Sequence, residues 1–386
     1  MEYVKLKGLV DLKQGMAINS KSNHLVVDHE TSLPLLRIAD MPTKRKVIFM
    51  DESTPERFWA DENDIIYTRT GQVGLVFRGQ KGVVHNNCFR VIPFDEKVLD
   101  RNYLYWVLTL KSIYNYANSI AAGAAQPDLP HDSFKTIQIP FFDIEVQRKI
   151  VNILDCFDKA IENNNKRIKI LEQMAENLYK EWFVRYRFPG HEGVEFEDGI
   201  PKGWKIMRIG EVSRLINGRA YLMPELQDEG KYRIVRVGNF SGKNEWFFSD
   251  MELDEDKYCS KGDLLYKWAC NFGPEIWDEE KVIFHYHIWK IIPNEMVNRE
   301  YLYHFLEYST PLWLGGTNGA TMVHITKESM EKKKIIVPSK KIVDRFGEMV
   351  VEINHNIWVL KEQKKNLEKQ RDLLLPRLMS GKLEIK

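Results

Sequence analysis

The residues of this chain whose types could support catalysis are a few carboxylates, histidines and glycines. Asp64 and Asp263 stand at matching positions, in NDIIY and GDLLY, and either could act as a catalytic carboxylate. An aspartate just ahead of a strand more commonly accepts hydrogen bonds from backbone N–H groups of its turn. We therefore interpret both as turn residues. A nuclease with a cryptic site built from these carboxylates stays an alternative.

A metal site is a second chemistry to consider. His285 and His287 would project from one face of a predicted strand, where both could ligate a metal ion. No third ligand lies close in sequence, and the matching earlier segment has His85 and Asn87 instead. We therefore predict no metal site. The cysteines have no short paired spacing, which is typical of reduced thiols in a cytosolic protein; they are Cys88, Cys156, Cys259 and Cys270.

The glycine-rich segments do not predict a cofactor loop. GGTNGAT (315–321) lacks the lysine of a phosphate-binding loop, and residues 71–74 (GQVG) fit a turn between two strands. The glycine-rich cofactor loop and the Asn-Pro-Pro-aromatic tetrapeptide of a methyltransferase do not occur in the sequence. The chain therefore does not read as an enzyme on its own, and we expect it to hold no cofactor.

The elements that would position any functional residues occur twice. RNYLYWVL begins at Arg101 and its near-copy REYLYHFL at Arg299. HNNCFRVIP and HYHIWKIIP precede the two copies, and a run ending in Ile-Pro or Val-Pro follows each. A duplicated domain gives a molecule internal two-fold character. The common ligand with two similar ends at a fixed spacing is duplex DNA.

Each copy mixes short strands with one helix. In the first copy we expect strands over 64–69, 73–77 and 89–93 and a helix over 102–118. In the second we expect strands over 263–268 and 287–293 and a helix over 299–308. Such a mixture in one compact unit is typical of an α+β domain.

Two segments have the 3.5-residue period of a long, packed helix. The first seam is Ile150, Leu154, Phe157, Ile161, Asn164, Ile168, Leu171, Ala175, Leu178 and Trp182. The second is Phe346, Val350, Ile353, Ile357, Leu360, Lys364, Leu367, Arg371, Leu374 and Leu378. Matching seams predict that the helices pack on each other, antiparallel if the repeats are related by a two-fold axis. A generic oligomerisation coil is the alternative reading of the pattern.

The predicted fold class is therefore α+β, with two duplicated mixed α/β domains. Two long antiparallel, coiled-coil-like helices separate them with pseudo-two-fold symmetry. The expected divisions are 1–141 (first domain), 142–188 (central spacer helix), 189–338 (linker and second domain) and 339–386 (distal spacer helix and C-terminal tail). At ~1.5 Å per residue, a helix over 144–186 would be roughly 65 Å long, enough to separate two DNA half-sites.

Charge and hydropathy narrow the function classes. The net charge is +1, and residues 1–140 carry 17 Lys and Arg against 16 Asp and Glu. Any DNA contact must therefore come from basic groups gathered on one face of each domain, and not from bulk attraction. No apolar run approaches the roughly 18–20 residues of a membrane span, and the N-terminus lacks a signal-peptide layout. We expect a cytoplasmic protein without a membrane partner.

Taken together, these segments resemble the specificity subunit of Type I restriction–modification systems. The resemblance covers nearly the whole chain. It rests on the order of domains and helices, on IPKGW (200–204) followed by IGEVSRLINGR (209–219), on GDLLY (262–266) and on LLPRLMSGKLEI (374–385). One departure is that the first domain starts at MEYVKLKG without the Pro and Trp of IPKGW.

The resemblance implies a function and a set of partners. Each domain would read half of an asymmetric bipartite target in double-stranded DNA. Two modification subunits would bind S-adenosylmethionine and methylate adenine at N6, and restriction subunits with ATP- and Mg-dependent motor and nuclease activity would complete the complex. This chain would be the non-catalytic scaffold. A stand-alone DNA-binding regulator and a plain coiled-coil adaptor are the rival readings.

Base and phosphate contacts need Arg, Lys, Asn, Gln and small polar side chains on loops held by a rigid sheet. In the first domain we predict Lys13, Gln14, Thr43, Lys44, Arg45, Lys46, Arg69, Thr70, Gln72 and Gln126 as DNA-binding residues. In the second we predict Asn217, Arg219, Tyr221, Arg236, Asn239, Lys267, Trp268, Asn271 and Thr321.

Overall fold

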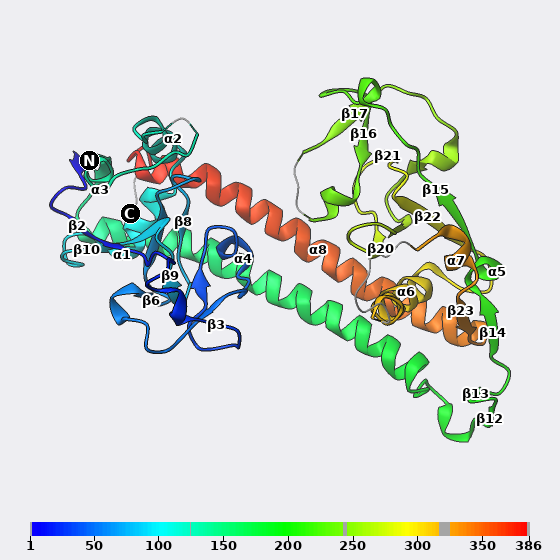
Figure 1. Ribbon diagram of the computed structural model, residues 1–386. Helices are drawn as coiled ribbons and strands as arrows, with labels where there is room; N and C mark the ends of the chain where they lie inside the picture. Colours follow the sequence, from blue (N-terminus) through cyan, green and yellow to red (C-terminus); the bar gives the residue numbers. More distant parts are fainter. Residues whose placement is uncertain (1, 124, 242–244, 316–324, 384–386) are drawn as a thin grey trace. The chain divides into compact units, whose positions relative to one another are not determined.

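The computed structural model describes residues 2–123, 125–241, 245–315 and 325–383, and it divides into two compact units (Figure 1). Unit 1 comprises the described residues of Met1–Asn164 and Glu362–Lys386, and unit 2 those of Asn165–Lys361. The division falls inside two long helices, α4 (Ile144–Tyr179) and α8 (Lys340–Met379). The domain boundaries expected from the sequence stay a prediction.

Unit 1 is built on an antiparallel sheet with the strand order β2-β10-β7-β8. A smaller sheet, β4-β9-β6, and the pairs β1-β11 and β3-β5 complete its β structure. The strands are β1 (Glu2–Lys5), β2 (Val10–Gln14), β3 (Val26–Val27), β4 (Leu35–Leu36), β5 (Phe49–Met50), β6 (Trp59–Ala60), β7 (Ile65–Thr68), β8 (Val76–Phe77), β9 (Gly82–Val84), β10 (Cys88–Pro93) and β11 (Gln138–Phe141).

The repeated motif RNYLYWVL forms α1 (Arg101–Leu108), whose first turn is capped by the Asp100 carboxylate. The prediction of one helix over 102–118 was wrong, because the chain breaks and continues as α2 (Lys111–Ser119). The backbone at Leu110 is extended, with ψ 132°, and its side chain is buried. This change of direction lets both helices bury apolar residues in the same core. A short helix, α3 (His131–Lys135), precedes β11.

Unit 2 repeats the same scheme. Its main sheet has the order β15-β22-β19-β20, and a second sheet has the order β17-β16-β21-β18. The pairs β12-β13 and β14-β23 complete it. The strands are β12 (Phe196–Glu197), β13 (Ile200–Pro201), β14 (Lys205–Arg208), β15 (Ser213–Asn217), β16 (Tyr232–Val235), β17 (Phe247–Ser249), β18 (Tyr258–Cys259), β19 (Leu264–Lys267), β20 (Gly273–Ile276), β21 (Val282–Phe284), β22 (Ile288–Pro293) and β23 (Lys334–Val337).

The helix formed by the second copy of the repeated motif, REYLYHFL, is longer than expected. α6 (Arg299–Leu314) extends beyond the predicted end at residue 308 and contains Pro311. Its last turns are held by burial, since the Thr310 hydroxyl lies 3.0 Å from the Tyr266 hydroxyl of β19. Packing therefore outweighs the helix-breaking preference of a proline near the helix end. Two short helices, α5 (Ile209–Val212) and α7 (Lys327–Glu331), lie beside β14 and β23.

The two heptad seams are confirmed, because every residue of both seams is buried or half-buried. In unit 1 the first turns of α4 share a core with the last turns of α8, through Leu154 and Leu378. In unit 2 the π-helical turn after α4 (Lys180–Val184) shares a core with the first turns of α8, through Trp182 and Phe346. Both contacts require antiparallel helices. In the described part of the chain, no helix has the length and apolarity of a membrane span.

In each unit, the strand that opens the α+β segment pairs with the strand that closes it. In unit 1, β1 pairs antiparallel with β11, with Glu2 opposite Phe141. In unit 2, β14 pairs antiparallel with β23, with Lys205 opposite Val337. The chain therefore begins and ends each α+β segment at neighbouring points. The helices α4 and α8 follow directly after β11 and β23.

Candidate nucleic-acid interface

Polar candidates gather at one edge of the main sheet of unit 1. Gln14 ends β2, Arg69 follows β7, and Asn87 precedes β10. Because these strands are antiparallel neighbours, the three positions meet at the same edge. We call this edge the sheet rim of unit 1. It is the natural place for a set of side chains that acts together.

The rim of unit 1 holds a hydrogen-bonded network centred on Arg69. Its guanidinium binds both carboxylate oxygens of Asp128, at 3.0 and 2.6 Å, and donates to the Gln14 side-chain oxygen at 3.0 Å. The Thr70 hydroxyl donates to Asp128 at 2.5 Å, and the His131 ring lies 2.9 Å from the Gln14 oxygen. The structure thus brings together three predicted residues, and adds two that sequence reasoning missed.

The electrostatics of this network fix its protonation state. The hydrogen bond from Arg69 lowers the pKa of Asp128, and burial lowers the pKa of His131. At neutral pH Asp128 is therefore an anion and His131 is uncharged. Gln14 also donates from its nitrogen to the carbonyl oxygens of Asn86 and Cys88, so its amide is engaged on both sides. This geometry makes Gln14 a residue that orients Arg69.

Gln72 and Gln126 lie on two neighbouring exposed loops beside this network. The backbone N–H of Gly71 donates to the carbonyl of Pro127 at 2.8 Å, which ties the loops together. As predicted, residues 71–74 form the turn between β7 and β8, and Gly71 and Gly74 both have positive φ. Both glutamine side chains are exposed, as contact with a ligand requires. Lys13 is exposed on β2 and is paired with Asp11 at 2.7 Å.

The predicted basic loop of residues 43–46 lies apart from the rim network. Thr43 ends the 3-10 turn η2 (Met41–Thr43), and Lys44, Arg45 and Lys46 line a hollow of about 220 Å³. Lys81, which sequence reasoning missed, also lines this hollow. The exposed side chains Lys44, Arg45 and Lys46 stand on one side of it, and Thr43 donates to the Asp40 carbonyl at 3.3 Å. The hollow is lined by four cations against two carboxylates, Asp40 and Glu62, and this excess of positive charge suits a phosphate group.

The rim of unit 2 has other side chains at matching positions. Register in the two sheets pairs Gln14 with Phe89 and Asn217 with Trp289, so Asn217 corresponds to Gln14. By the same register Trp268 corresponds to Arg69. Trp268 stacks on Trp289 with ring centroids 5.7 Å apart, and its indole donates to the Tyr286 carbonyl at 2.9 Å. A flat indole replaces a guanidinium at the same point of the fold.

Arg219 is the cation of this second rim. It binds both carboxylate oxygens of Glu225, at 3.0 and 2.7 Å, and lies 5.2 Å from the centre of the Tyr221 ring. The Tyr221 hydroxyl is buried without a hydrogen-bond partner in the described residues, and burial raises its pKa to about 12. The Arg219–Glu225 pair spans only six residues and was therefore open to recognition from sequence.

The two histidines considered for a metal site lie in a turn. His285 and His287 stand between β21 and β22, so the expectation of a strand face was wrong. Burial, together with the nearby charges of His287 and Arg236, lowers the pKa of His285 to about 4. Among the residues that the structure describes, no cluster of three or more His, Cys, Asp or Glu is arranged to hold a metal ion.

The remaining candidates of unit 2 are tied into its loops. The Asn239 side chain accepts from the Arg236 backbone N–H at 2.8 Å, and Asn271 donates to the Ser241 hydroxyl at 3.2 Å. Lys267 is buried and paired with Glu275 at 2.6 Å. Thr321 lies outside the described residues. These predicted contacts stay predictions.

The interpretation of Asp64 and Asp263 as turn residues is confirmed. Asp64 accepts from the Asp61 backbone N–H at 3.0 Å, and Asp263 accepts from the Ser260 backbone N–H at 2.8 Å. Each also faces a cation of the central strand, Arg90 at 3.1 Å and Lys290 at 3.6 Å. These carboxylates support the sheet.

Two glycines allow close contact between backbone segments at the rims. A Cβ at Gly15 would lie 2.2 Å from the His85 carbonyl oxygen, and a Cβ at Gly218 would lie 2.3 Å from that of His285. Only glycine permits such close approach of two backbone segments. The contact is the same in both units and follows directly after β2 or β15. It places the residue after each glycine, Met16 or Arg219, beside the turn that starts the central strand.

Comparison with known proteins agrees with this duplicated architecture. Residues 1–173 and 201–374 match the family model described as the Type I restriction modification DNA specificity domain. The MjaIX specificity subunit of Methanocaldococcus jannaschii is 28% identical over 343 residues, covering 83% of this chain and 78% of that protein. The HindI specificity subunit of Haemophilus influenzae is 24% identical over 406 residues, covering 83% and 87%.

The fold is similar to a solved one. The S subunit of a Type I restriction–modification system from M. genitalium has a TM-score of 0.56 at 16% identity, covering 100% of this chain and 96% of that one. The two matched segments take in both sheets and both rims. The chain therefore belongs to the Type I restriction modification DNA specificity family.

Proposed function

We propose that this chain reads a bipartite, asymmetric sequence in double-stranded DNA, with the rim of unit 1 contacting one half and the rim of unit 2 the other. The observation that carries the proposal is the pair of rims on one scaffold with different polar side chains. Arg69 and Thr70 offer donors in the first, and Asn217 and Arg219 in the second. Arginine and asparagine are the side chains best suited to base edges in the major groove.

Phosphate contacts would position the domains without reading sequence. The hollow lined by residues 44–46 and Lys81 supports this role in unit 1, because it gathers cations on an otherwise balanced chain. Carboxylates hold Arg69 and Arg219 in place. DNA would have to compete for these guanidiniums, which favours a partner that offers two acceptors at once, such as guanine.

We further propose that the chain acts as the scaffold of a larger complex. Two modification subunits with bound S-adenosylmethionine would methylate adenines at N6, and restriction subunits using ATP and Mg would supply the motor and nuclease. Target adenines must leave the base stack to be methylated, so a separate catalytic pocket fits a reader that holds the duplex. The chain itself would hold no cofactor and would contribute no catalytic group.

A methylation assay with the purified complex tests the proposal. Duplexes randomised in either half-site are incubated with wild-type, Arg69→Ala and Trp268→Ala complexes, and methylated positions are mapped. We expect each variant to relax or lose selection in one half only. Lys97→Ala is the matched control for loss of charge, because this exposed lysine follows the opposite end of β10 and is not among the predicted DNA-binding residues. Methyl transfer by the chain alone would contradict the scaffold role.

Two rival functions make distinct predictions. A stand-alone regulator would bind its target tightly without partners and would not copurify with a methyltransferase. A nuclease built on Asp64 and Asp263 would cleave DNA in the presence of Mg, and Asp263→Ala would abolish the cleavage. The hydrogen bonds and ion pairs of both carboxylates favour the scaffold.

A further inference from the structure

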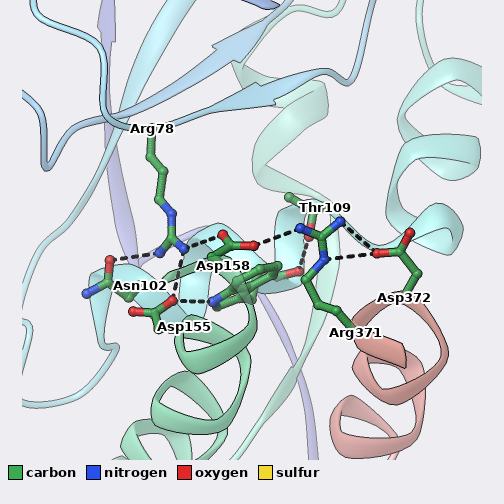
Figure 2. Close-up of polar contacts among 8 residues, drawn as sticks. Arg78, Asn102, Thr109, Asp155, Asp158, Arg371 and Asp372 are labelled. Atoms are coloured by element: carbon green, nitrogen blue, oxygen red, sulfur yellow. Dashed lines mark hydrogen bonds and ion pairs between the residues drawn. The ribbon is translucent and has the colours of Figure 1, made fainter. Parts of the chain in front are cut away.

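The α+β segment of unit 1, from β1 to β11, contacts the long helices through charged and aromatic side chains (Figure 2). Arg78, which follows β8, binds Asp155 at 2.9 Å and Asp158 at 2.8 Å, both on α4. Arg371 of α8 binds the other oxygen of Asp158 at 2.7 Å. The Trp106 indole of α1 donates to Asp155 at 2.9 Å. We call these five residues the unit 1 joint.

Aromatic rings and burial strengthen the unit 1 joint. The Arg78 guanidinium lies 4.2 Å from the centre of the Tyr105 ring and 5.0 Å from that of Trp106. The side chains of Arg78 and Asp155 are each 21% exposed. Cations stacked on rings and paired with carboxylates at this depth are held firmly. Two arginines and a tryptophan thus fill the space between the α+β segment of unit 1 and the helix pair.

Unit 2 lacks all five of these side chains at the matching positions. Strand register makes Ile276 the counterpart of Arg78, and the repeated helix motif makes His304 the counterpart of Trp106. The heptad seams make Ala175 the counterpart of Arg371. The same alignment places Val351 and Asn354 where unit 1 has Asp155 and Asp158. Smaller and uncharged groups stand wherever unit 1 builds its joint, apart from the imidazole of His304.

The missing bulk leaves a cavity. Ile276, His304, Ala175 and Asn354 all line a hollow of about 580 Å³ within unit 2, which we call the unit 2 cavity. In unit 1 the matching space is occupied by the joint. The cavity is therefore the place where two guanidiniums and an indole are absent, and not an accident of loose packing.

The walls of the unit 2 cavity suit a cation. Five carboxylates and three lysine or arginine side chains line it, together with the rings of Tyr303, His304 and Trp358. Glu172 has no hydrogen-bond or ion-pair partner within the described residues. Glu307 accepts from the Tyr303 hydroxyl at 3.3 Å and faces the His304 ring at 3.2 Å. The other three carboxylates already pair with lysines, and Lys261 lies 4.5 Å from the centre of the Trp358 ring. An added positive charge would therefore find Glu172, Glu307 and the rings of Tyr303 and His304.

We propose that the unit 2 cavity receives the guanidinium of an arginine side chain from a partner protein. We infer an arginine because the matching space of unit 1 holds arginines against carboxylates and aromatic rings. A lysine would supply charge but not the planar, stackable fork. The identity of the partner as a modification subunit rests on the proposed function, but the chemistry of the cavity does not.

Binding of a blocked arginine tests the cavity without any partner or DNA. Nα-acetyl-arginine amide is titrated into the full chain labelled at tryptophan indoles, and the signal assigned to Trp358 is followed by NMR. We expect saturable, millimolar binding that the neutral citrulline analogue does not reproduce. Glu172→Gln with Glu307→Gln should weaken binding about tenfold, because charge-assisted hydrogen bonds are lost. Equal binding of citrulline, or no saturable binding, would overturn the proposal.

Two further variants separate the cavity from general effects on the fold. Glu368→Gln removes the unit 1 counterpart of Glu172 on α8 and should leave probe binding within about twofold of wild type. Ala175→Arg restores the residue found in unit 1 and should abolish probe binding while the thermal midpoint stays equal or rises. Probe binding that survives Ala175→Arg would place the site elsewhere and contradict the proposal.

The partner is tested separately by copurification. We expect the modification subunit to copurify in lower yield with Ala175→Arg than with Glu368→Gln. If the probe binds the cavity but copurification is unchanged, the cavity takes an arginine and its assignment to the modification subunit is wrong. If no methyltransferase copurifies with wild type, the proposed function fails, while the probe result still decides the cavity.

Discussion

The two rims share a backbone and differ in their side chains. Both have a glycine pressed against the carbonyl before the central strand, and both have an aspartate bonded to a cation of that strand. At matching rim positions, however, unit 1 has Gln14 and Arg69 where unit 2 has Asn217 and Trp268. The difference teaches that the fold constrains the sheet and leaves the rim free to vary. Side chains that vary on a fixed scaffold are what two different readers need.

The largest expected effect tests the shared part of the comparison. Gly15→Ala and Gly218→Ala each place a Cβ within 2.3 Å of a backbone oxygen, which cannot be relieved by a side-chain rotation. We expect each to lower the free energy of unfolding by about 3 kcal/mol. Chemical denaturation followed by circular dichroism measures it. A large loss for one glycine and none for the other would show that the two scaffolds are not equivalent.

The unit 1 joint gives the next largest effect. Arg78→Ala leaves Asp155 and Asp158 with one cation fewer in a half-buried site, and we expect a loss of about 2 kcal/mol in unfolding free energy. Arg185→Ala is the matched control, because this exposed arginine makes only a surface pair with Glu181. Its expected loss is below about 0.5 kcal/mol. Similar losses for both variants would remove the distinction between the joint and the surface.

Substitution at the rims sharpens the comparison where the units differ. Arg69→Ala and Trp268→Ala should each weaken binding to the cognate duplex about tenfold, with relaxed selection in one half-site. Fluorescence anisotropy at fixed salt concentration, with duplexes altered in either half, measures both affinity and selection. Relaxation of the same half by both substitutions would break the assignment of one rim to each half.

The smallest expected effect is a pH dependence of stability that the turns before the two central strands have in common. His285 has a folded pKa of about 4, below the ordinary 6.5, because it is buried. Between pH 6.5 and 4, His285 is therefore protonated in the unfolded chain and unprotonated in the folded chain. The contribution of His285 to the stability of the folded state is complete above pH 6.5 and is lost as the pH falls towards 4. Thermal midpoints over this range should fall less steeply for His285→Asn.

The matching histidine of unit 1 provides the comparison for this pH effect. Burial also lowers the pKa of His85, and Arg37 lowers it further. We therefore expect His85→Asn to change the slope in the same direction. Opposite directions for the two variants would show that the turns have different electrostatic surroundings.

Patterns of period and repetition predicted most of the fold. The heptad seams alone placed both long helices, because burial along a helix must follow its turns. The duplicated RNYLYWVL motif placed α1 and α6, and the turn at residues 71–74 followed from its glycines. The break at Leu110 was not predictable, since it depends on the core into which both short helices pack. The length of α6 past Pro311 depends in the same way on its contact with Tyr266.

Less of the candidate site could be predicted. Residue types and strand ends placed Arg69, Thr70 and Gln14 on one rim, but their partners Asp128 and His131 come from a loop far along the chain. No local pattern connects residues that meet only through folding. Lys81 joins the basic loop of residues 44–46 for the same reason. The unit 2 cavity could not be found from either copy alone, because it exists as a difference between them.

The pairing of β1 with β11 and of β14 with β23 has an evolutionary consequence. A segment whose two ends are neighbours can be cut out and replaced by another of different length or sequence without moving the helices that follow it. If each unit reads one half-site as proposed, recombination at these two-stranded junctions would give the protein a new half-target in a single genetic event. The long helices and the other unit would need no compensating change.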